Sequence, residues 1–283
     1  MADLQSVLRG ARTRLSEAGV SSAALDARIL VEHFSGTARE DAILRPSLEL
    51  AGRIVQTIEQ AVERRAGGEP VHRIIGEREF FGLPLKLSAE TLEPRPDTET
   101  LVEAVLPFCR ETAAREGECR ILDLGTGTGA IALALLSQVP EAHAWGVDVA
   151  PGALETAAAN AEALGLSGRF APTLSDWWEK IEGCFHLIVT NPPYISGTEM
   201  EALVDEVRRF DPTRALYGGV DGLDAYRKIA TGARRHLEKD GLVALEIGWQ
   251  QGDAVSALFV AEGFEPAGRF RDFGNNERVL LFR

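Results

Sequence analysis

Two hydrophobic patterns divide the 283-residue chain. In residues 1–66, apolar side chains recur at the 3.6-residue spacing of amphipathic helices, and the first stripe consists of Leu4, Val7, Leu8, Ala11 and Leu15. Two further stripes follow, and Gly67-Gly68-Glu69-Pro70 interrupts the last of them. The pattern predicts a small helical domain at residues 1–68.

Beyond residue 68, short apolar runs replace the helical stripes. Ile74-Ile75, Phe80-Phe81 and residues 83–87, punctuated by glycines, predict short strands or a hairpin in a linker over residues 69–96. From residue 97 a helix is followed by a repeated strand-helix rhythm, with expected strands at residues 120–124, 143–148, 169–173, 187–190, 242–247, 264–270 and 278–282. Strands separated by helices form a mostly parallel sheet covered on both faces. The last connection is short and turn-rich, so it can join only antiparallel strands. We therefore expect an α/β domain at residues 97–283.

A glycine-rich loop joins the first of these strands to a helix. Asp123-Leu124 precedes Gly125-Thr126-Gly127-Thr128-Gly129, and an apolar helix begins directly afterwards. Glycines let the backbone approach a ligand closely, and a helix N-terminus directs N–H groups at it. Asp148 ends the next strand, nineteen residues after Gly129, where a carboxylate can accept hydrogen bonds from a ribose diol. The pattern predicts a nucleoside-containing ligand, although the loop also fits the dinucleotide fingerprint.

A second motif, Asn191-Pro192-Pro193-Tyr194, follows the fourth expected strand. The first and fourth strands are neighbours in a doubly wound sheet, so this motif should face the ligand of the glycine loop. The prolines lack N–H groups and fix φ, which keeps the loop rigid and leaves nearby carbonyls as acceptors. Together with the Asn191 side-chain carbonyl, these acceptors suit a planar NH2 group, on which Tyr194 can stack. Such acceptors would orient and polarise an amide nitrogen, which is otherwise a poor nucleophile.

Composition and charge exclude several classes of protein. The hydrophobic fraction of 45% and the charged fraction of 26% are those of an ordinary globular protein. No apolar run approaches the ~18 residues of a membrane span, and the acidic N-terminus does not resemble a secretory signal. Three scattered cysteines suggest neither a disulfide framework nor a metal site, so we expect a cytoplasmic protein without a metal. The net charge of −13 disfavours a protein that tracks a phosphate backbone.

Residues 122–129 together with Asn191-Pro192-Pro193-Tyr194 resemble the S-adenosylmethionine-dependent amino-methyltransferases. Within that class, the segments Glu69-Pro70-Val71, 94–99, 218–223 and 245–252 are similar to the bacterial peptide chain release factor N5-glutamine methyltransferases, the PrmC/HemK family. The resemblance covers nearly the whole chain. It implies a Rossmann-like methyltransferase fold with a seven-stranded, mostly parallel sheet and an antiparallel last strand. It also implies methylation of N5 of the glutamine in the Gly-Gly-Gln motif of class I release factors, with S-adenosylmethionine as cofactor.

The resemblance assigns a role to each motif. The methionine part of the cofactor would contact Gly125, Thr126, Gly127, Thr128 and Gly129, its ribose Asp148, and its adenine Asp176 and Trp177. Asn191, which would also contact the cofactor, would receive the glutamine amide together with the Pro192 carbonyl, Pro193 and Tyr194. Arg95 and Glu99 match a Pro-Arg-Pro segment near the active site, although residues 96–99 also read as an ordinary helix start. We expect a monomer with release factors as its protein partner, docked by the helical domain, and no direct binding to nucleic acid or membrane.

Some positions depart from the family pattern. Ser175-Asp176-Trp177-Trp178 replaces the common Gly-Asp-Trp-Phe, Glu93 stands where many members have an aliphatic residue, and His72-Arg73 replaces an aromatic-aliphatic pair. These departures affect the expected contacts of the adenine and between domains. Trp178 can equally be a core residue.

Four alternative functions remain open at this stage. A ribosomal-protein glutamine methyltransferase would share the catalytic loop, and an adenine-N6 methyltransferase of nucleic acid would present the same planar NH2 group. The acidic charge disfavours the latter. A nicotinamide-dependent oxidoreductase would leave the motif at 191–194 unexplained. A non-enzymatic sensor of S-adenosylmethionine would have no need of an intact acceptor loop.

Overall fold

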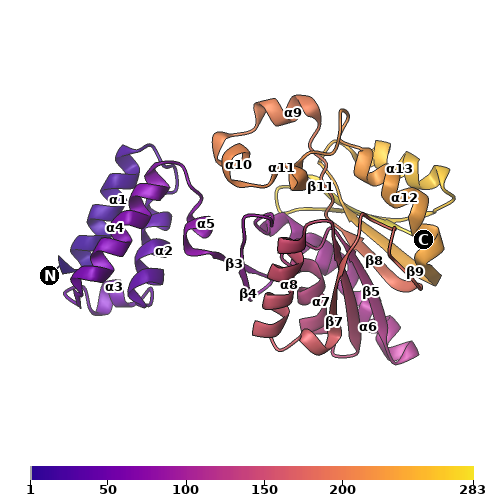
Figure 1. The fold of residues 1–283 in the computed structure, drawn as a ribbon, viewed down its shortest axis with the longest axis horizontal. Helices are drawn as coiled ribbons and strands as arrows, with labels where there is room; N and C mark the ends of the chain where they lie inside the picture. Colours follow the sequence, from indigo (N-terminus) through magenta and orange to yellow (C-terminus); the bar gives the residue numbers. More distant parts are fainter. Residues whose placement is uncertain (1) are drawn as a thin grey trace. The chain divides into compact units, whose positions relative to one another are not determined.

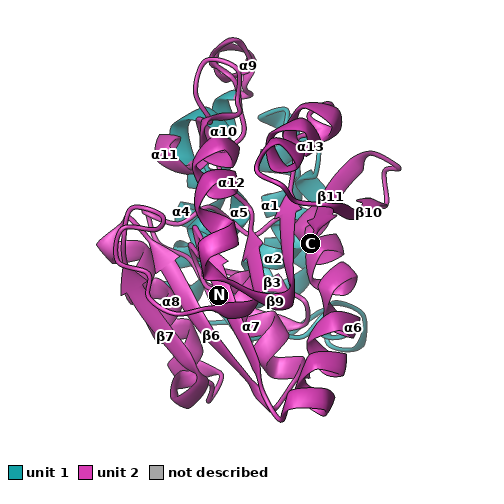
Figure 2. Ribbon diagram, turned by 90° about the vertical axis from the view of Figure 1, so that its right-hand side faces the viewer, with its two compact units in different colours: residues 1–76, 205–210 teal, residues 77–204, 211–283 magenta. Residues whose placement is uncertain are grey.

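A computed structural model describes residues 2–283, which form two compact units (Figures 1 and 2). The first unit comprises residues 2–76 and 205–210, and the second comprises residues 77–204 and 211–283. The segment expected as a linker at 69–96 is therefore shared between the two units. None of the helices described for residues 2–283 combines the length and the apolar character needed to cross a bilayer.

The first unit is a helical bundle. Its main helices are the three that the apolar stripes predict, α1 (Leu4–Glu17), α2 (Ala23–Ser35) and α4 (Gly52–Ala66), and their apolar faces share one core. The remaining elements are short: β1 (Ala2–Asp3), α3 (Asp41–Leu44), β2 (Glu49–Leu50), α5 (Val71–Ile75) and α10 (Asp205–Phe210). Arg65 on α4 is buried, pairs with Asp26 at 2.7 Å and also contacts Glu206 of α10 at 3.4 Å. This contact helps to explain why a helix from much later in the sequence belongs to this unit.

The expected strand at Ile74-Ile75 is wrong, because these residues form the end of α5. Val71 and Ile74 are buried in the helical core, so a helical turn places both on the same face. Gly76, with a φ of 79°, ends the helix by donating its N–H to the His72 carbonyl. The two later apolar runs do form a hairpin, consisting of the antiparallel strands β3 (Glu77–Phe80) and β4 (Leu83–Lys86).

The second unit is built on a seven-stranded sheet with the order β10-β11-β9-β8-β5-β6-β7. The strands are β5 (Cys119–Leu124), β6 (Ala142–Asp148), β7 (Phe170–Leu174), β8 (Phe185–Thr190), β9 (Leu237–Glu246), β10 (Pro266–Arg271) and β11 (Glu277–Phe282). β5 to β9 pair in parallel, whereas β11 lies antiparallel between β9 and β10. The mostly parallel sheet and its antiparallel last strand are thus confirmed. β5 and β8, the first and fourth strands, are neighbours as predicted.

Helices cover both faces of this sheet (Figure 1). α6 (Glu99–Glu116), α7 (Ala130–Gln138) and α8 (Pro151–Ala163) pack on one face, and α12 (Asp224–His236) and α13 (Gly252–Ala261) pack on the other. Alternate strand residues separate accordingly: Ile121 joins the first core and Leu122 the second. The other elements are the 3-10 turns η1 (Pro96–Thr98) and η2 (Ser167–Arg169), and the short helices α9 (Gly197–Ala202) and α11 (Thr213–Leu216).

Candidate active site

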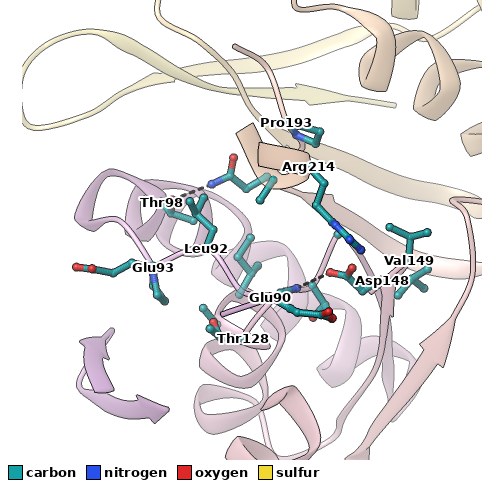
Figure 3. Close-up of a pocket in the computed structure, with 18 of the residues that line it drawn as sticks. Glu90, Leu92, Glu93, Thr98, Thr128, Asp148, Val149, Pro193 and Arg214 are labelled. Atoms are coloured by element: carbon teal, nitrogen blue, oxygen red, sulfur yellow. Dashed lines mark hydrogen bonds between the residues drawn. The ribbon is translucent and has the colours of Figure 1, made fainter. Parts of the chain in front are cut away.

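A cavity of about 280 Å³ opens at the carboxyl ends of the parallel strands in the second unit (Figure 3). Its walls come from the loops that follow β5, β6, β7 and β8, from residues 90–98 and from α11. The predicted site residues that line it are Arg95, Gly125, Thr126, Gly127, Thr128, Asp148, Asp176, Trp177, Asn191 and Pro193. Glu99, Gly129, Pro192 and Tyr194 are not among its lining residues. The structure therefore brings ten of the predicted residues around one space, and the other four lie in the same segments as these lining residues.

The glycine loop needs its glycines for backbone conformation. Gly125, Gly127 and Gly129 have φ values of 72°, 55° and 81°, which residues with a side chain rarely adopt. A Cβ on Gly127 would meet no protein atom within 4 Å, because this residue faces the cavity. A Cβ on Gly129 would lie 3.0 Å from Leu133 Cδ1 of α7 and 3.3 Å from Ala157 Cβ of α8, so Gly129 leaves room for these two side chains.

A buried carboxylate, Asp123, supports this loop from behind. Its Oδ2 accepts hydrogen bonds from Thr126 Oγ1 at 2.7 Å and from the Ala132 N–H at 3.3 Å. Oδ1 has no partner among residues 2–283. Burial raises the pKa of Asp123 to about 7, although the bonds from Thr126 and Ala132 act in the opposite direction.

Asp148 ends β6 at the rim of the same loop. Its two oxygens accept hydrogen bonds from the Gly127 N–H at 3.0 Å and the Ala150 N–H at 2.9 Å. Burial raises its pKa, whereas these backbone bonds and the positive charge of Arg214 lower it. Figure 3 shows the Arg214 side chain extending toward Asp148 across the cavity. The carboxylate is thus held at the cavity wall in a fixed orientation.

The segment after β7 forms the far wall of the cavity. Trp177 lines the cavity with a φ of 49°, and the Ser175 hydroxyl stabilises this turn by donating to the Trp177 carbonyl at 3.1 Å and accepting from the Lys180 N–H at 3.0 Å. The serine that departs from the family pattern therefore holds a turn through its own side chain. Trp178 donates to the Lys228 carbonyl and stacks on His236, so it is a packing residue.

The loop Asn191-Pro192-Pro193-Tyr194 follows β8 and presents Asn191 and Pro193 to the cavity. Asn191 Nδ2 donates to Thr98 Oγ1 at 3.1 Å, a bond drawn as a dashed line in Figure 3. The amide nitrogen is therefore engaged inside the protein, which leaves the Asn191 carbonyl oxygen as the group that can accept a further hydrogen bond. Tyr194 is largely buried, and burial raises its pKa to about 12.

Two segments that the resemblance singled out pack directly against this loop. A Cβ on Gly218 would lie 2.7 Å from the Pro193 carbonyl oxygen, and one on Gly222 would overlap the Tyr194 carbonyl oxygen. Gln251 Nε2 donates to the carbonyls of Tyr194 at 3.0 Å and Gly222 at 3.3 Å, while its Oε1 accepts from the backbone N–H of residue 248 at 3.0 Å. These contacts hold the loop from the side away from the cavity.

The Pro-Arg-Pro segment combines one cavity residue with structural contacts. Arg95 lines the cavity and pairs with the buried Asp211 at 2.6 Å. Glu99 instead accepts a hydrogen bond from the Phe81 N–H at 2.8 Å and so fixes the β3–β4 hairpin. Glu93, the departure from an aliphatic residue, is buried and is compensated by an ion pair with Arg78 at 2.6 Å.

The sequence does not identify Thr98 or Arg214 as site residues. Thr98 lies in a segment that also reads as a helix start. Arg214 lies in a short helix with no motif, so it gives no local signal. Asp123 precedes the glycine loop in the sequence, but its burial depends on tertiary packing.

Comparison with known proteins agrees with this geometry. Residues 6–76 match the family model described as PrmC N-terminal domain, and residues 107–210 match Methyltransferase small domain. A release factor glutamine methyltransferase of Agrobacterium fabrum is 49% identical over 282 residues, which are 100% of this chain and 98% of that protein. The chain belongs to the release factor glutamine methyltransferase family. The family member of Escherichia coli K12 is 41% identical over 91% of each chain.

Solved structures with low sequence identity share the fold of this family member. A methyltransferase from Pyrococcus furiosus aligns with a TM-score of 0.53 at 20% identity, over 71% of this chain and 89% of that one. A ribosomal protein L11 methylase from Lactobacillus delbrueckii subsp. bulgaricus aligns with a TM-score of 0.51 at 16% identity, over 68% of this chain and 81% of that one. The Rossmann-like methyltransferase fold predicted from sequence is confirmed.

Proposed function

We propose that this protein methylates N5 of the glutamine in the Gly-Gly-Gln motif of class I peptide chain release factors, with S-adenosylmethionine as methyl donor. The main support is the orientation of Asn191. Thr98 holds its amide nitrogen, so its carbonyl oxygen is the acceptor that is offered at the end of β8, next to the glycine loop on β5. A carbonyl acceptor suits the NH2 group of a glutamine side chain. Membership of the family supports the choice of substrate.

The cavity residues fit the proposed methyl donor. Gly127 leaves open space for close approach of a ligand to the backbone, and the Asp148 carboxylate is fixed where a ribose diol can donate to it. Apolar side chains of Ile131, Val147 and Trp177 line the cavity and can receive an adenine ring. Asp176 lies beside Trp177, where its carboxylate can accept a hydrogen bond from the exocyclic amine of the adenine.

Catalysis would then consist mainly of orientation. When bound, S-adenosylmethionine supplies a methyl group activated by an adjacent sulfonium. The Asn191 carbonyl and the Pro192 carbonyl would accept both amide hydrogens of the glutamine, so that its nitrogen lone pair points at the methyl carbon. The C–N bond would form as the S–C bond of the bound cofactor breaks, and the methylated nitrogen would then release a proton to water. This step would need no general base, because the methylated amide nitrogen carries a positive charge and releases its proton readily.

We also propose that the helical unit docks the release factor. Its described residues line no part of the cavity, so the unit is free to serve another purpose. Cross-linking of the full-length protein to a release factor, followed by mass spectrometry, tests this role. Links from residues 1–68 to the release factor are expected, and links confined to residues 77–283 would contradict it.

Mass spectrometry of a release factor incubated with the protein and S-adenosylmethionine tests the function itself. The expected result is a gain of one methyl group, which disappears when the glutamine of the Gly-Gly-Gln motif is replaced by alanine. Methylation of a ribosomal protein or a nucleic acid in place of a release factor would refute the proposed substrate.

Asn191→Ala tests the proposed role of the loop. This variant should lower turnover by about 10²-fold or more, because it removes an orienting acceptor. Cofactor affinity, measured by calorimetry, should change little. A parallel loss of cofactor binding would contradict the assigned role.

A further inference from the structure

A single polar side chain is buried in the helix α8. The other buried residues of this helix are Ala153, Leu154, Ala157 and Ala161, whereas Asn160 carries an amide and is only 1% exposed. Asparagine is a poorer helix former than alanine, and a buried amide is costly unless its polar atoms are hydrogen-bonded. We therefore expect the bonds of this side chain to serve a purpose outside α8.

The Asn160 amide binds two segments that are far apart in the sequence. Its Oδ1 accepts a hydrogen bond from the Lys86 N–H at 2.8 Å, and its Nδ2 donates to the carbonyls of Lys86 at 3.1 Å and Thr128 at 2.9 Å. These partners fix the orientation of the amide, because the reverse orientation would place its NH2 group against an N–H and its oxygen against two carbonyls. A carboxylate or an aliphatic side chain of the same size would supply neither of the two donors.

Both segments belong to walls of the cavity. Thr128 is part of the glycine loop and lines the cavity (Figure 3). Lys86 ends β4, and residues 87–95, here called the strap, lead from it to η1. The strap supplies the lining residues Glu90, Leu92, Glu93, Pro94 and Arg95. Asn160 does not line the cavity itself, so it can act on a ligand only through these two walls.

A second hydrogen bond holds the strap to the same helix. Glu90 Oε2 accepts from the Gly152 N–H at 3.0 Å, in the first turn of α8. Between these two attachments the strap forms a turn of its own, in which Thr91 Oγ1 donates to the Ser88 carbonyl at 3.1 Å and accepts from the Ser88 N–H at 3.0 Å. The helix α8 is therefore the support from which the strap is held, and Asn160 joins that support to the glycine loop.

We propose that Asn160 is a positioning residue that sets the spacing between the strap and the glycine loop, and thereby the affinity for the cofactor. One NH2 group serves the carbonyls of both walls, so neither wall can move away without the loss of a hydrogen bond. Neither wall includes Asn191, so the acceptor for the substrate amide should not depend on this link. The inference rests on the function proposed above, because it concerns the binding of S-adenosylmethionine.

The test uses two variants of the full-length protein. Asn160→Leu keeps a similar volume and Asn160→Ala favours the helix, and both remove the link between the walls. We expect each to raise the Kd for S-adenosylmethionine, measured by titration calorimetry, by roughly 10- to 25-fold. The reason is that at least two hydrogen bonds, each worth about fivefold in an equilibrium constant, no longer hold the binding-competent spacing. At saturating cofactor, kcat should stay within about threefold of the wild type.

Arg169→Met is the matched control for a merely structural role. Arg169 also bonds three backbone carbonyls, those of Leu136 at 2.9 Å, Val139 at 3.0 Å and Ala142 at 3.1 Å. These bonds lie at the end of β6 away from Asp148, and Arg169 does not line the cavity. Its loss should lower the unfolding midpoint as the loss of Asn160 does, yet leave the Kd for S-adenosylmethionine within about twofold.

Hydrogen exchange supplies a second measurement. The Lys86 N–H donates to Asn160, and Lys86 does not line the cavity, so cofactor binding should slow its exchange through the link. The Ala142 N–H, which donates to the Val139 carbonyl at 3.1 Å, reports the general stabilisation that a bound ligand gives. Protection at Lys86 should exceed that at Ala142 by at least about threefold in the wild type, and this excess should disappear in Asn160→Ala. If neither Asn160 variant folds, the exchange of the wild type decides the question.

Three results would overturn the inference: a wild-type Kd in both Asn160 variants, an equal rise of Kd in Arg169→Met, or equal protection of Lys86 and Ala142 in the wild type. Binding of S-adenosylmethionine by the wild type is the reference for all of them. If the wild type binds no S-adenosylmethionine, the proposed function fails, and this inference fails with it. If the wild type binds it and the Asn160 variants bind it equally well, only the role of Asn160 fails.

Discussion

Gln251 supports the loop at residues 191–194 from outside the cavity. Its removal should therefore show what the support of this loop contributes, apart from any contact with a ligand. It does not line the cavity, yet its amide bonds three backbone groups: the carbonyls of Tyr194 and Gly222, and the N–H of Gly248. Gln251→Ala would therefore release the catalytic loop without touching cofactor or substrate. We expect a loss of both stability and turnover, with cofactor binding retained.

The size of the effect follows from these three bonds. Each hydrogen bond contributes about 1 kcal/mol net, which gives about 3 kcal/mol as an upper bound. Because Gln251 is only half-buried, water can replace part of these hydrogen bonds in the variant. We therefore expect the free energy of unfolding to fall by about 2 kcal/mol. For a unit of this size, that corresponds to a drop in Tm of about 4–8 °C. A shift of the loop by a fraction of an ångström should lower kcat by about 10- to 100-fold.

Scanning calorimetry and steady-state kinetics on the full-length protein test this prediction. Gln138→Ala is the matched control, since Gln138 is an exposed glutamine at the end of α7 whose side chain donates a hydrogen bond to the Ser137 hydroxyl at 3.4 Å and does not line the cavity. It should change Tm by less than about 2 °C and leave kcat intact. Wild-type turnover in Gln251→Ala would show that the loop is rigid without this support. Weakened cofactor binding would show that Gln251 acts on the cavity instead.

Three further predictions concern the cofactor side of the cavity. Because burial raises the pKa of Asp123 from 3.8 to about 7, the folded state binds this proton more tightly than the unfolded state; stability should therefore fall as pH rises from about 4 to 7. Asp123→Asn should remove this dependence, which is worth about 2–3 kcal/mol between pH 5 and pH 8 because about 2 pH units separate pH 5 from the raised pKa. Urea unfolding at the two pH values measures it, and an unchanged difference between them would contradict the shift. Ser175→Gly removes the bonds to Trp177 and Lys180 and should weaken cofactor binding several-fold by calorimetry, whereas unchanged affinity would mean that the turn holds without them. Gly127→Ala should abolish cofactor binding and lower the free energy of unfolding by about 1–2 kcal/mol. Gly129→Ala should lower the free energy of unfolding further, because its Cβ would meet Leu133. Equal unfolding midpoints of the two variants would refute this contrast.

The fold was predictable because its strand and helix periods are clear in the sequence. The parallel order of β5 to β9 follows from the alternation of strands with helices, and the antiparallel β11 follows from the short turn before it. The strand expected at Ile74-Ile75 failed because two adjacent apolar residues carry no period, and burial against the helical core decided in favour of a helix.

The candidate site was predictable only where backbone chemistry defines it. Glycine permits a positive φ and proline fixes φ, so these residues indicate the backbone conformation directly. The loops at residues 125–129 and 191–194 can therefore be predicted from the sequence. Thr98 and Arg214 reach the site through tertiary packing, and single polar residues give no local signal of such packing. Glu99 was predicted as a site residue because it lies in the Pro-Arg-Pro segment. Its side chain instead accepts a hydrogen bond from the Phe81 N–H of the β3–β4 hairpin.

The membership of α10 in the helical unit has a consequence for synthesis on the ribosome. The first 76 residues emerge early, but Glu206, which contacts Arg65, follows about 130 residues later. At about 5–20 residues per second, the early bundle waits roughly 6–26 s for this partner. Arg65 is not left alone during that interval, because Asp26 precedes it in the chain and pairs with it at 2.7 Å. The bundle can thus form as soon as it is made, and the nascent chain adds α10 to it while the second unit is still being completed.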